Sequence, residues 1–164
     1  VLLKPIDSQF FISLKKINPS GFLEIMLGFF LLLFCIRINQ INLSLSFLSL
    51  SLITISCSIC ILYSLWFFIS TTTIWFVKTW NAIEVLRSFL YIGRFPLNSF
   101  SFSLRVFFSI FIPIAFITTI PSEVFLGLSQ LWKILLEVIV ASVFLITSRK
   151  FWLFALKFYS SASS

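Results

Sequence analysis

The sequence contains no histidine and little charge, since only 10% of its 164 residues are Asp, Glu, Lys or Arg. Histidine is the side chain most often used as a general base and as a metal ligand. The chain also lacks a glycine-rich phosphate loop, a pair of carboxylates in one polar segment, and a serine beside a candidate base. We therefore expect no enzymatic activity in the chain itself, and no catalytic, cofactor-binding or metal-binding residue.

Cysteine is scarce as well, and all three cysteines, Cys35, Cys57 and Cys60, lie in apolar segments. Their odd number and the absence of a histidine partner argue against a disulfide framework, a zinc site or a redox centre. We expect them to be small residues that fill space between helices.

Apolar residues, by contrast, make up 60% of the chain. No charged residue occurs from position 43 to position 77, a stretch longer than the roughly 20 residues that a helix needs to cross a bilayer. A soluble domain of this length would carry more charge. The composition predicts one all-α integral membrane domain, with four transmembrane helices at residues 22–36, within 43–76, at 101–118 and at 131–147.

Residues 43–56 alternate serine with large apolar side chains, which is also the pattern of a β-strand. A transmembrane barrel needs many strands of about 9 to 11 residues separated by polar turns, and no other part of the chain alternates in this way. We therefore interpret the segment as helical. Its serines could form a face on which another helix packs closely, or a polar lining for a translocation path.

The basic residues predict the orientation of these helices. With residues 1–20 in the cytoplasm, all 12 Lys and Arg residues except Arg37 and Lys133 lie on the cytoplasmic side, as the positive-inside rule requires. An even number of crossings then returns the C-terminus to the same side. We expect a cytoplasmic segment at 1–20, a transmembrane domain at 21–148 and a cytoplasmic tail at 149–164.

Two charged residues fall within the predicted spans. Glu137 lies about a turn and a half into the last span, where a carboxylate costs on the order of 2.5 to 3.5 kcal/mol. Lys133 lies four residues earlier on the same helix face, so the two could form a structural pair; alternatively, Glu137 lines or gates a pathway. Arg105 can extend from the start of its span towards the cytoplasmic headgroups.

A broken helix is expected at residues 111–127. Pro113 removes a backbone donor in the middle of a predicted span, and Pro121 can begin a new helix. Glu123 would lie in the first turn of that helix, and Gly127 could end it. Irregular backbone at membrane depth is tolerated only where protein or a water-filled cavity covers it. The segment is therefore either a proline kink or a re-entrant pair of helices before the last span, which would act as a gate in the outer leaflet.

Several short motifs resemble those of one known family. They are LLKP at residues 2–5, Phe76, RFPL at 94–97, IPIAFITTIPSEVFLG at 112–127 and LKFYSSASS at 156–164. In their order and spacing, the chain resembles the C-terminal two-thirds of an ABC-2 type exporter permease. The first residue is Val, and two spans at the front of this six-span family have no counterpart here, so we expect the natural start to lie upstream.

The resemblance implies that the four spans are numbers three to six of a permease in a bacterial cytoplasmic membrane. It also implies ABC ATPase subunits, a second permease copy or paralogue, and membrane lipid as partners, with no cofactor and no nucleic acid. Residues 1–20 would be the coupling segment that binds the ATPase, through Lys4, Pro5, Asp7, Lys15 and Lys16. The family places short re-entrant helices in the region of Pro113 and Pro121.

The alternative function is a non-transporting membrane scaffold or assembly factor, which would need only the spans. An ATPase partner in the cytosol would distinguish the permease from the scaffold. A proton-coupled carrier that uses Glu137 is less favoured, because such carriers often show a repeated half-architecture that this chain lacks.

Overall fold

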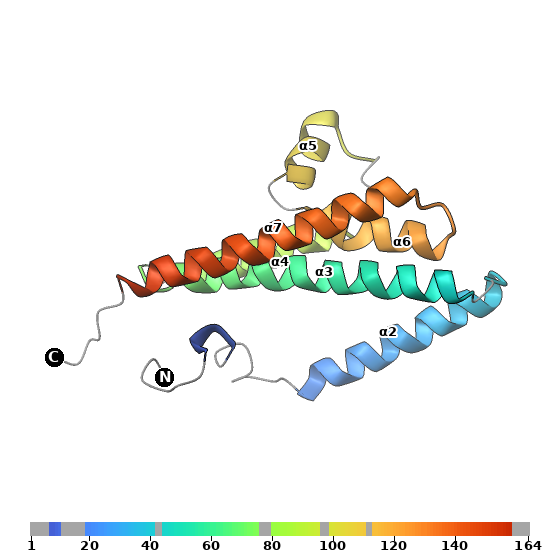
Figure 1. Cartoon of the computed structure of the whole chain (residues 1–164), viewed down its shortest axis with the longest axis horizontal. Coiled ribbons are helices and arrows are strands. Elements are labelled where there is room, and N and C mark those ends of the chain that lie inside the picture. Colours follow the sequence, from blue (N-terminus) through green and yellow to red (C-terminus); the bar gives the residue numbers. More distant parts are fainter. Residues whose placement is uncertain are drawn as a thin grey trace. The chain divides into compact units, whose positions relative to one another are not determined.

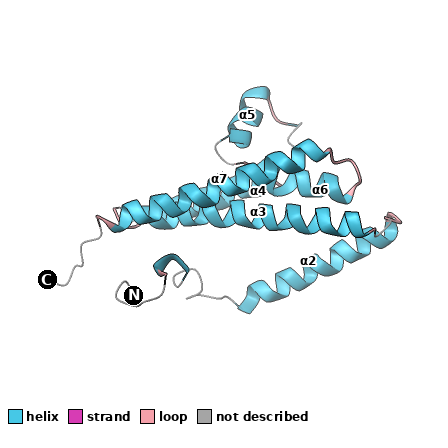
Figure 2. Cartoon of the chain, in the orientation of Figure 1, coloured by secondary structure: helices cyan, strands magenta, loops and turns pink. Residues whose placement is uncertain are grey.

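The computed structural model describes residues 7–10, 19–41, 44–75, 80–95, 99–110 and 113–158. Within these ranges the chain forms helices, turns and loops and no strand (Figure 2). The helices are α2 (Pro19–Ile38), α3 (Leu45–Thr72), α4 (Trp80–Ile92), α5 (Phe102–Ile110), the π-helix η2 (Ala115–Thr119), α6 (Ile120–Phe125) and α7 (Leu131–Leu156). In this part of the chain α2, α3 and α7 are long and apolar enough to cross a membrane. The prediction of an all-α membrane protein is confirmed.

The chain divides into two compact units, Val1–Asn42 and Leu43–Ser164. Helix α2 belongs to the first unit, and it begins at a proline, whose missing N–H is not needed at that position. It ends where Gln40 adopts a left-handed backbone with a φ of 50°. Most side chains along α2 are exposed. A helix that is apolar on all sides is expected where lipid covers it.

The second unit is built on α3 and α7, which lie side by side along most of their length (Figure 1). The two helices run in the same direction. Near their N-terminal ends Leu50 of α3 packs against a cluster of buried residues that includes Ile134 of α7. Near their C-terminal ends the rings of Phe67 and Trp152 meet edge to face, with centroids 5.3 Å apart.

One face of α3 buries small and polar side chains, namely Ser51, Thr54, Ser58, Ser64 and Thr71. Four of these hydroxyl groups, all except that of Ser51, lie 2.7 to 3.1 Å from a carbonyl oxygen one turn earlier in the helix. Small residues allow helices to approach closely, and bonds to the helix's own backbone reduce the cost of burying a hydroxyl. Because these side chains are buried, a packing role is supported for this face of α3. Several other serines of residues 43–56 are exposed.

The third predicted span, residues 101–118, is not a single helix. Helix α5 ends at Ile110, and a second helical segment, made of η2 and α6, follows Pro113. Proline disfavours a helical conformation in the residue before it, so α5 is not expected to continue into η2. The hydropathy of this region is uniform, and composition alone therefore joins two helices that the backbone separates.

Two short helical segments instead line α3, one after the other, in the direction opposite to it. Leu86 of α4 is buried in the same hydrophobic cluster as Ile61 and Leu65 of α3. Phe125, at the end of α6, contacts Phe47 near the start of α3, with ring centroids 5.8 Å apart. Helix α4 therefore lies beside the C-terminal half of α3, and η2 and α6 lie beside its N-terminal half.

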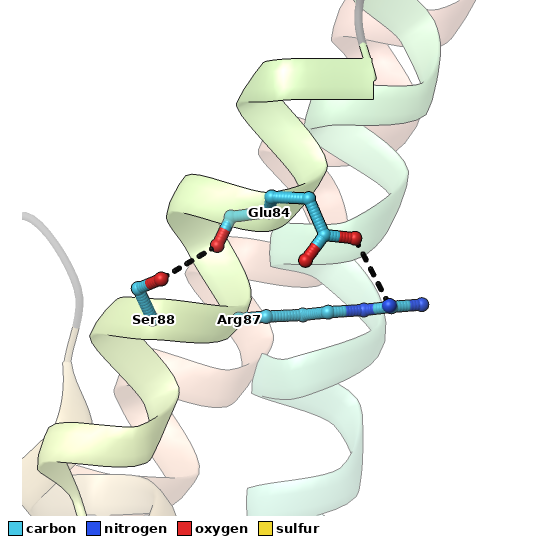
Figure 3. Close-up of polar contacts among 3 residues, drawn as sticks. All are labelled: Glu84, Arg87 and Ser88. Carbon is cyan, nitrogen blue, oxygen red and sulfur yellow. Dashed lines mark hydrogen bonds and ion pairs between the residues drawn. The ribbon is translucent and has the colours of Figure 1, made fainter.

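Helix α4 lies between the predicted spans within 43–76 and at 101–118, in a segment that carries charge. Glu84 Oε1 and Arg87 Nη1 form an ion pair at 3.0 Å on a face where both side chains are about half exposed or more (Figure 3). Ser88 Oγ donates to the Glu84 carbonyl at 2.9 Å. The Arg87 guanidinium also lies 5.8 Å from the ring centroid of Trp66 on α3. The helix is therefore amphipathic and packs on α3 through its apolar face.

Candidate functional site

Pro121 accompanies an irregular stretch of helix in the second unit. The π-helix η2 leads directly into α6, which begins beside Pro121 as predicted. The Ile120 N–H donates to Ala115 O, five residues back, and not to Phe116 O. The next residue, Pro121, has no N–H at all. The Phe116 carbonyl therefore has no backbone donor four residues later, as in an α-helix, and none five residues later, as in a π-helix.

Ser58 of α3 lies where this missing donor is needed. Its Oγ is 3.1 Å from Phe116 O. The same Oγ is 3.1 Å from Glu137 Oε1 on α7 and 2.9 Å from Thr54 O on its own helix. Helices α3, η2 and α7 thus meet at one hydroxyl group, and we call Ser58, the Phe116 carbonyl and Glu137 the Ser58 junction.

Glu137 is completely buried at this junction, with an exposed fraction of 0%. Its Oε2 accepts no hydrogen bond from the described residues. Lys133 Nζ forms a 2.6 Å ion pair with Glu123 Oε2 on α6. The predicted pair of Lys133 with Glu137 is therefore wrong. Because Lys133 is held by Glu123, Glu137 has no cationic partner in the described part of the chain.

A pocket of about 220 Å³ opens beside the Glu123–Lys133 ion pair. Its lining includes Ala115, Phe116 and Thr119 of η2, Glu123 of α6, and Trp132 and Lys133 of α7. The two charged side chains are about one quarter exposed. The pocket is therefore largely apolar, with one ion pair in its wall.

Gly127 ends α6, as the sequence predicted. Its backbone φ is +69°, a left-handed conformation that glycine adopts without strain. The Leu128 N–H donates to Glu123 O at 2.9 Å and the Gly127 N–H donates to Val124 O at 3.1 Å. This is the Schellman pattern of a helix C-terminus. The turn that follows brings Lys133 back to Glu123.

The remaining predicted site residues lie outside the Ser58 junction. Arg105 of α5 donates from Nη2 to the Phe100 carbonyl at 3.4 Å. Pro113 is buried immediately before η2. Asp7, in the first unit, accepts the Gln9 N–H on Oδ1 at 2.9 Å and so caps a short helical turn. Four predicted coupling residues lie outside the described ranges: Lys4, Pro5, Lys15 and Lys16.

Two parts of the junction were not predicted, namely Ser58 and the Phe116 carbonyl. A proline five residues after Phe116 does signal a carbonyl with a missing donor, but it does not identify the hydroxyl that lies opposite. Cys57 and Cys60 also stand at C-x-x-C spacing, a signal that composition alone overlooks. Both thiols are free, and no group of three potential metal ligands occurs among the described residues.

We expect Glu123→Gln to lower the free energy of unfolding of the second unit by about 0.5 to 1.5 kcal/mol, because it removes a charge-assisted bond that solvent partly screens. The measurement is denaturant unfolding in detergent micelles. Exchanging the two charges, with Glu123→Lys and Lys133→Glu together, should recover most of the loss. If the exchange adds to the loss, the pair does not stabilise the turn.

The chain matches the model of one protein family, described as "ABC-2 family transporter protein", over residues 1–163. No curated protein and no solved structure matches it. The family match covers the long helices of both units and every residue of the Ser58 junction.

Proposed function

Because the chain belongs to the ABC-2 family of transporter proteins, we propose that it is the membrane-spanning permease subunit of an ATP-driven exporter. The family match over residues 1–163 is the observation that carries this proposal. Helices α2, α3 and α7 have the apolar length that a permease needs to cross a bilayer.

We further propose that separate ATPase subunits bind and hydrolyse ATP, and that the permease pairs with a second copy or a paralogue. Membership of the family supports an ATPase partner. The distribution of Lys and Arg supports an orientation with both termini in the cytoplasm. A bacterial inner membrane is proposed as its location from the resemblance to exporter permeases. In this arrangement residues 1–20 form the coupling segment, 21–148 the transmembrane domain and 149–164 the tail, although α7 continues to Leu156.

The outer gate of this exporter is proposed to be the segment 113–127. Pro113 and Gly127 bound it, and Pro121 interrupts its hydrogen bonding. π-Helical turns occur frequently at functional sites, because they carry backbone groups that lack a regular partner. The adjacent pocket and the Glu123–Lys133 pair lie on the same segment or face it, which supports a role in opening and closing.

Reversing two charges in the coupling segment is expected to weaken binding of the ATPase. Lys15→Glu with Lys16→Glu should lower the amount of ATPase that co-purifies with the tagged chain by about fivefold or more, because it reverses the two positive charges proposed to contact the ATPase. Mass spectrometry of the detergent-solubilised complex measures this amount. Membrane insertion of the variant should be unchanged.

The adjacent basic pair Arg149 and Lys150 offers a matched control, because it lies on the same proposed side but outside the coupling segment. Reversing both of its charges should leave ATPase capture near the wild-type level. If no P-loop ATPase co-purifies with the unaltered chain, the exporter function is wrong and the scaffold is favoured. If the ATPase binds but the Lys15 and Lys16 variant captures it normally, only the coupling assignment fails.

A further inference from the structure

The Ser58 hydroxyl is surrounded by more acceptors than it can satisfy. A serine hydroxyl has one hydrogen to donate and two lone pairs with which to accept. Its Oγ lies 2.9 Å from Thr54 O, 3.1 Å from Phe116 O and 3.1 Å from Glu137 Oε1. When Glu137 is ionised, all three partners are acceptors, and a single hydrogen must serve them all.

The Phe116 carbonyl and the Glu137 carboxylate are the two acceptors that compete for the Ser58 hydrogen. Thr54 O lies in the regular part of α3, where the backbone N–H four residues later can bond to it. Phe116 O has lost its helical donors at Pro121, and leaving a part-buried carbonyl without a partner is unfavourable. An ionised Glu137 would therefore take the hydrogen that the Phe116 carbonyl needs.

Neighbouring charged groups do not offset an ionised Glu137. On its own helix, α7, the nearest cation in sequence is Lys133, which is held by Glu123 on α6 at 2.6 Å. On α3, Cys57 stands next to Ser58 in the sequence, and a thiol is only a weak hydrogen-bond donor. Residues 115–119 of η2 include no ionisable side chain. A buried carboxylate without a cation carries a large desolvation cost.

We propose that Glu137 is a proton-binding site that supplies the missing hydrogen to the Ser58 junction. The carboxyl O–H on Oε1 donates to Ser58 Oγ, and the Ser58 O–H in turn donates to Phe116 O. A hydronium ion transfers one proton to the carboxylate and leaves as water, the charge of Glu137 becomes zero, and no other covalent bond of the protein changes.

Release of the proton reverses this arrangement. The Ser58 hydroxyl then turns back to the carboxylate, and the Phe116 carbonyl is left without a donor at the π-helix. Proton binding at Glu137 therefore holds η2 against α3 and α7. This inference concerns the chain by itself and does not depend on an ATPase partner.

Infrared spectroscopy of the protein in lipid nanodiscs tests the proposal directly, because the chain has only 5 Asp and Glu residues. At neutral pH, Glu137→Gln is expected to remove the carbonyl-stretch band of a protonated carboxylic acid from the wild-type spectrum. Glu84→Gln is the matched control. Its side chain is about half exposed and paired with Arg87, so this variant should lose carboxylate bands only.

A second variant tests the hydrogen bond to Ser58. Ser58→Ala should retain the protonated band of Glu137 but shift it to higher frequency, because the carboxyl group loses its acceptor, and Ser58→Thr should restore the original frequency. A spectrum in which Glu137→Gln removes only carboxylate bands overturns the proposal. A rise in unfolding temperature with added Na⁺ that Glu137→Gln abolishes also overturns it, in favour of a metal cation.

Discussion

Replacing Gly93 by leucine is expected to destabilise the second unit by about 1 to 3 kcal/mol, through overpacking of its core. Gly93 comes directly after α4. A Cβ atom at this position would lie 3.0 Å from Ile114 Cγ2 and 3.2 Å from Thr118 Cγ2. Ile114 has an exposed fraction of only 1%, so it has little space into which to move. A leucine side chain would force α4 and η2 apart.

The unfolding midpoint in detergent, followed by circular dichroism, measures this effect. Gly28→Leu is a matched control, because a Cβ built at Gly28 in α2 meets no heavy atom within 4 Å apart from its chain neighbours and its own helix backbone. Gly93→Ala should fall between the two, since it adds only the Cβ atom. Equal midpoints for Gly93→Leu and Gly28→Leu would contradict the close contact of α4 with η2.

The contact of Gly93 with Ile114 and Thr118 joins two segments that together line α3, although this part of the sequence contains prolines and charged residues. Helix α4 covers one half of α3, and the η2–α6 segment covers the other. Gly93 allows the two short segments to meet, since any side chain there would separate them. Helix α5, which lies between these segments in the sequence, contributes Phe108 to the same hydrophobic cluster as Ile61.

The long helices could be predicted because bilayer thickness and apolar length are linked directly. The prediction at residues 22–36 lies within α2, and the prediction at 131–147 starts where α7 starts. Helix α7 is longer than predicted, since it continues through Arg149 and Lys150 to Leu156. Charged residues mark the expected edge of the bilayer's hydrocarbon core. They do not end the helix, because its backbone can continue to form hydrogen bonds beyond that edge.

The short helices could not be predicted by the same rule. A hydropathy pattern excludes α4 because of Glu84 and Arg87, although these residues pair with each other on an exposed face. The same pattern joins α5 to η2 because both are apolar. Packing of α4 on α3, which depends on contacts between residues far apart in the sequence, decides the first case, and the backbone restriction at Pro113 decides the second.

The candidate site was predicted in part. Glu137 stands out in the sequence because a carboxylate in an apolar span is costly, and the structure buries it completely. Its partner was predicted wrongly, because the i, i+4 rule considers only one helix. Lys133 reaches Glu123 across the turn at Gly127, and Ser58 reaches Glu137 from α3. Both contacts follow from the way the helices pack.

Replacing Pro121 by alanine is expected to convert η2 into regular α-helix and to rotate α6. The new N–H at position 121 could donate to Ile117 O, and the Ile120 N–H could return to Phe116 O. Removing a proline from a helix interior favours this change by up to about 3 kcal/mol. Closing a π-turn removes one residue from the helical register, which corresponds to a rotation of about 100° for the residues that follow.

The rotation should move Phe125 away from Phe47, whose rings now lie 5.8 Å apart. Cysteines at these two positions, in a background without the three native cysteines, should therefore crosslink efficiently through a short bismaleimide and several-fold less well when Pro121→Ala is added. The unfolding midpoint should stay the same or rise, which separates a change of register from general unfolding. Pro19→Ala is the matched control, because proline at the first position of α2 interrupts no hydrogen bond. Unchanged crosslinking in the Pro121→Ala variant would show that packing against α3, and not the proline, maintains the π-helix.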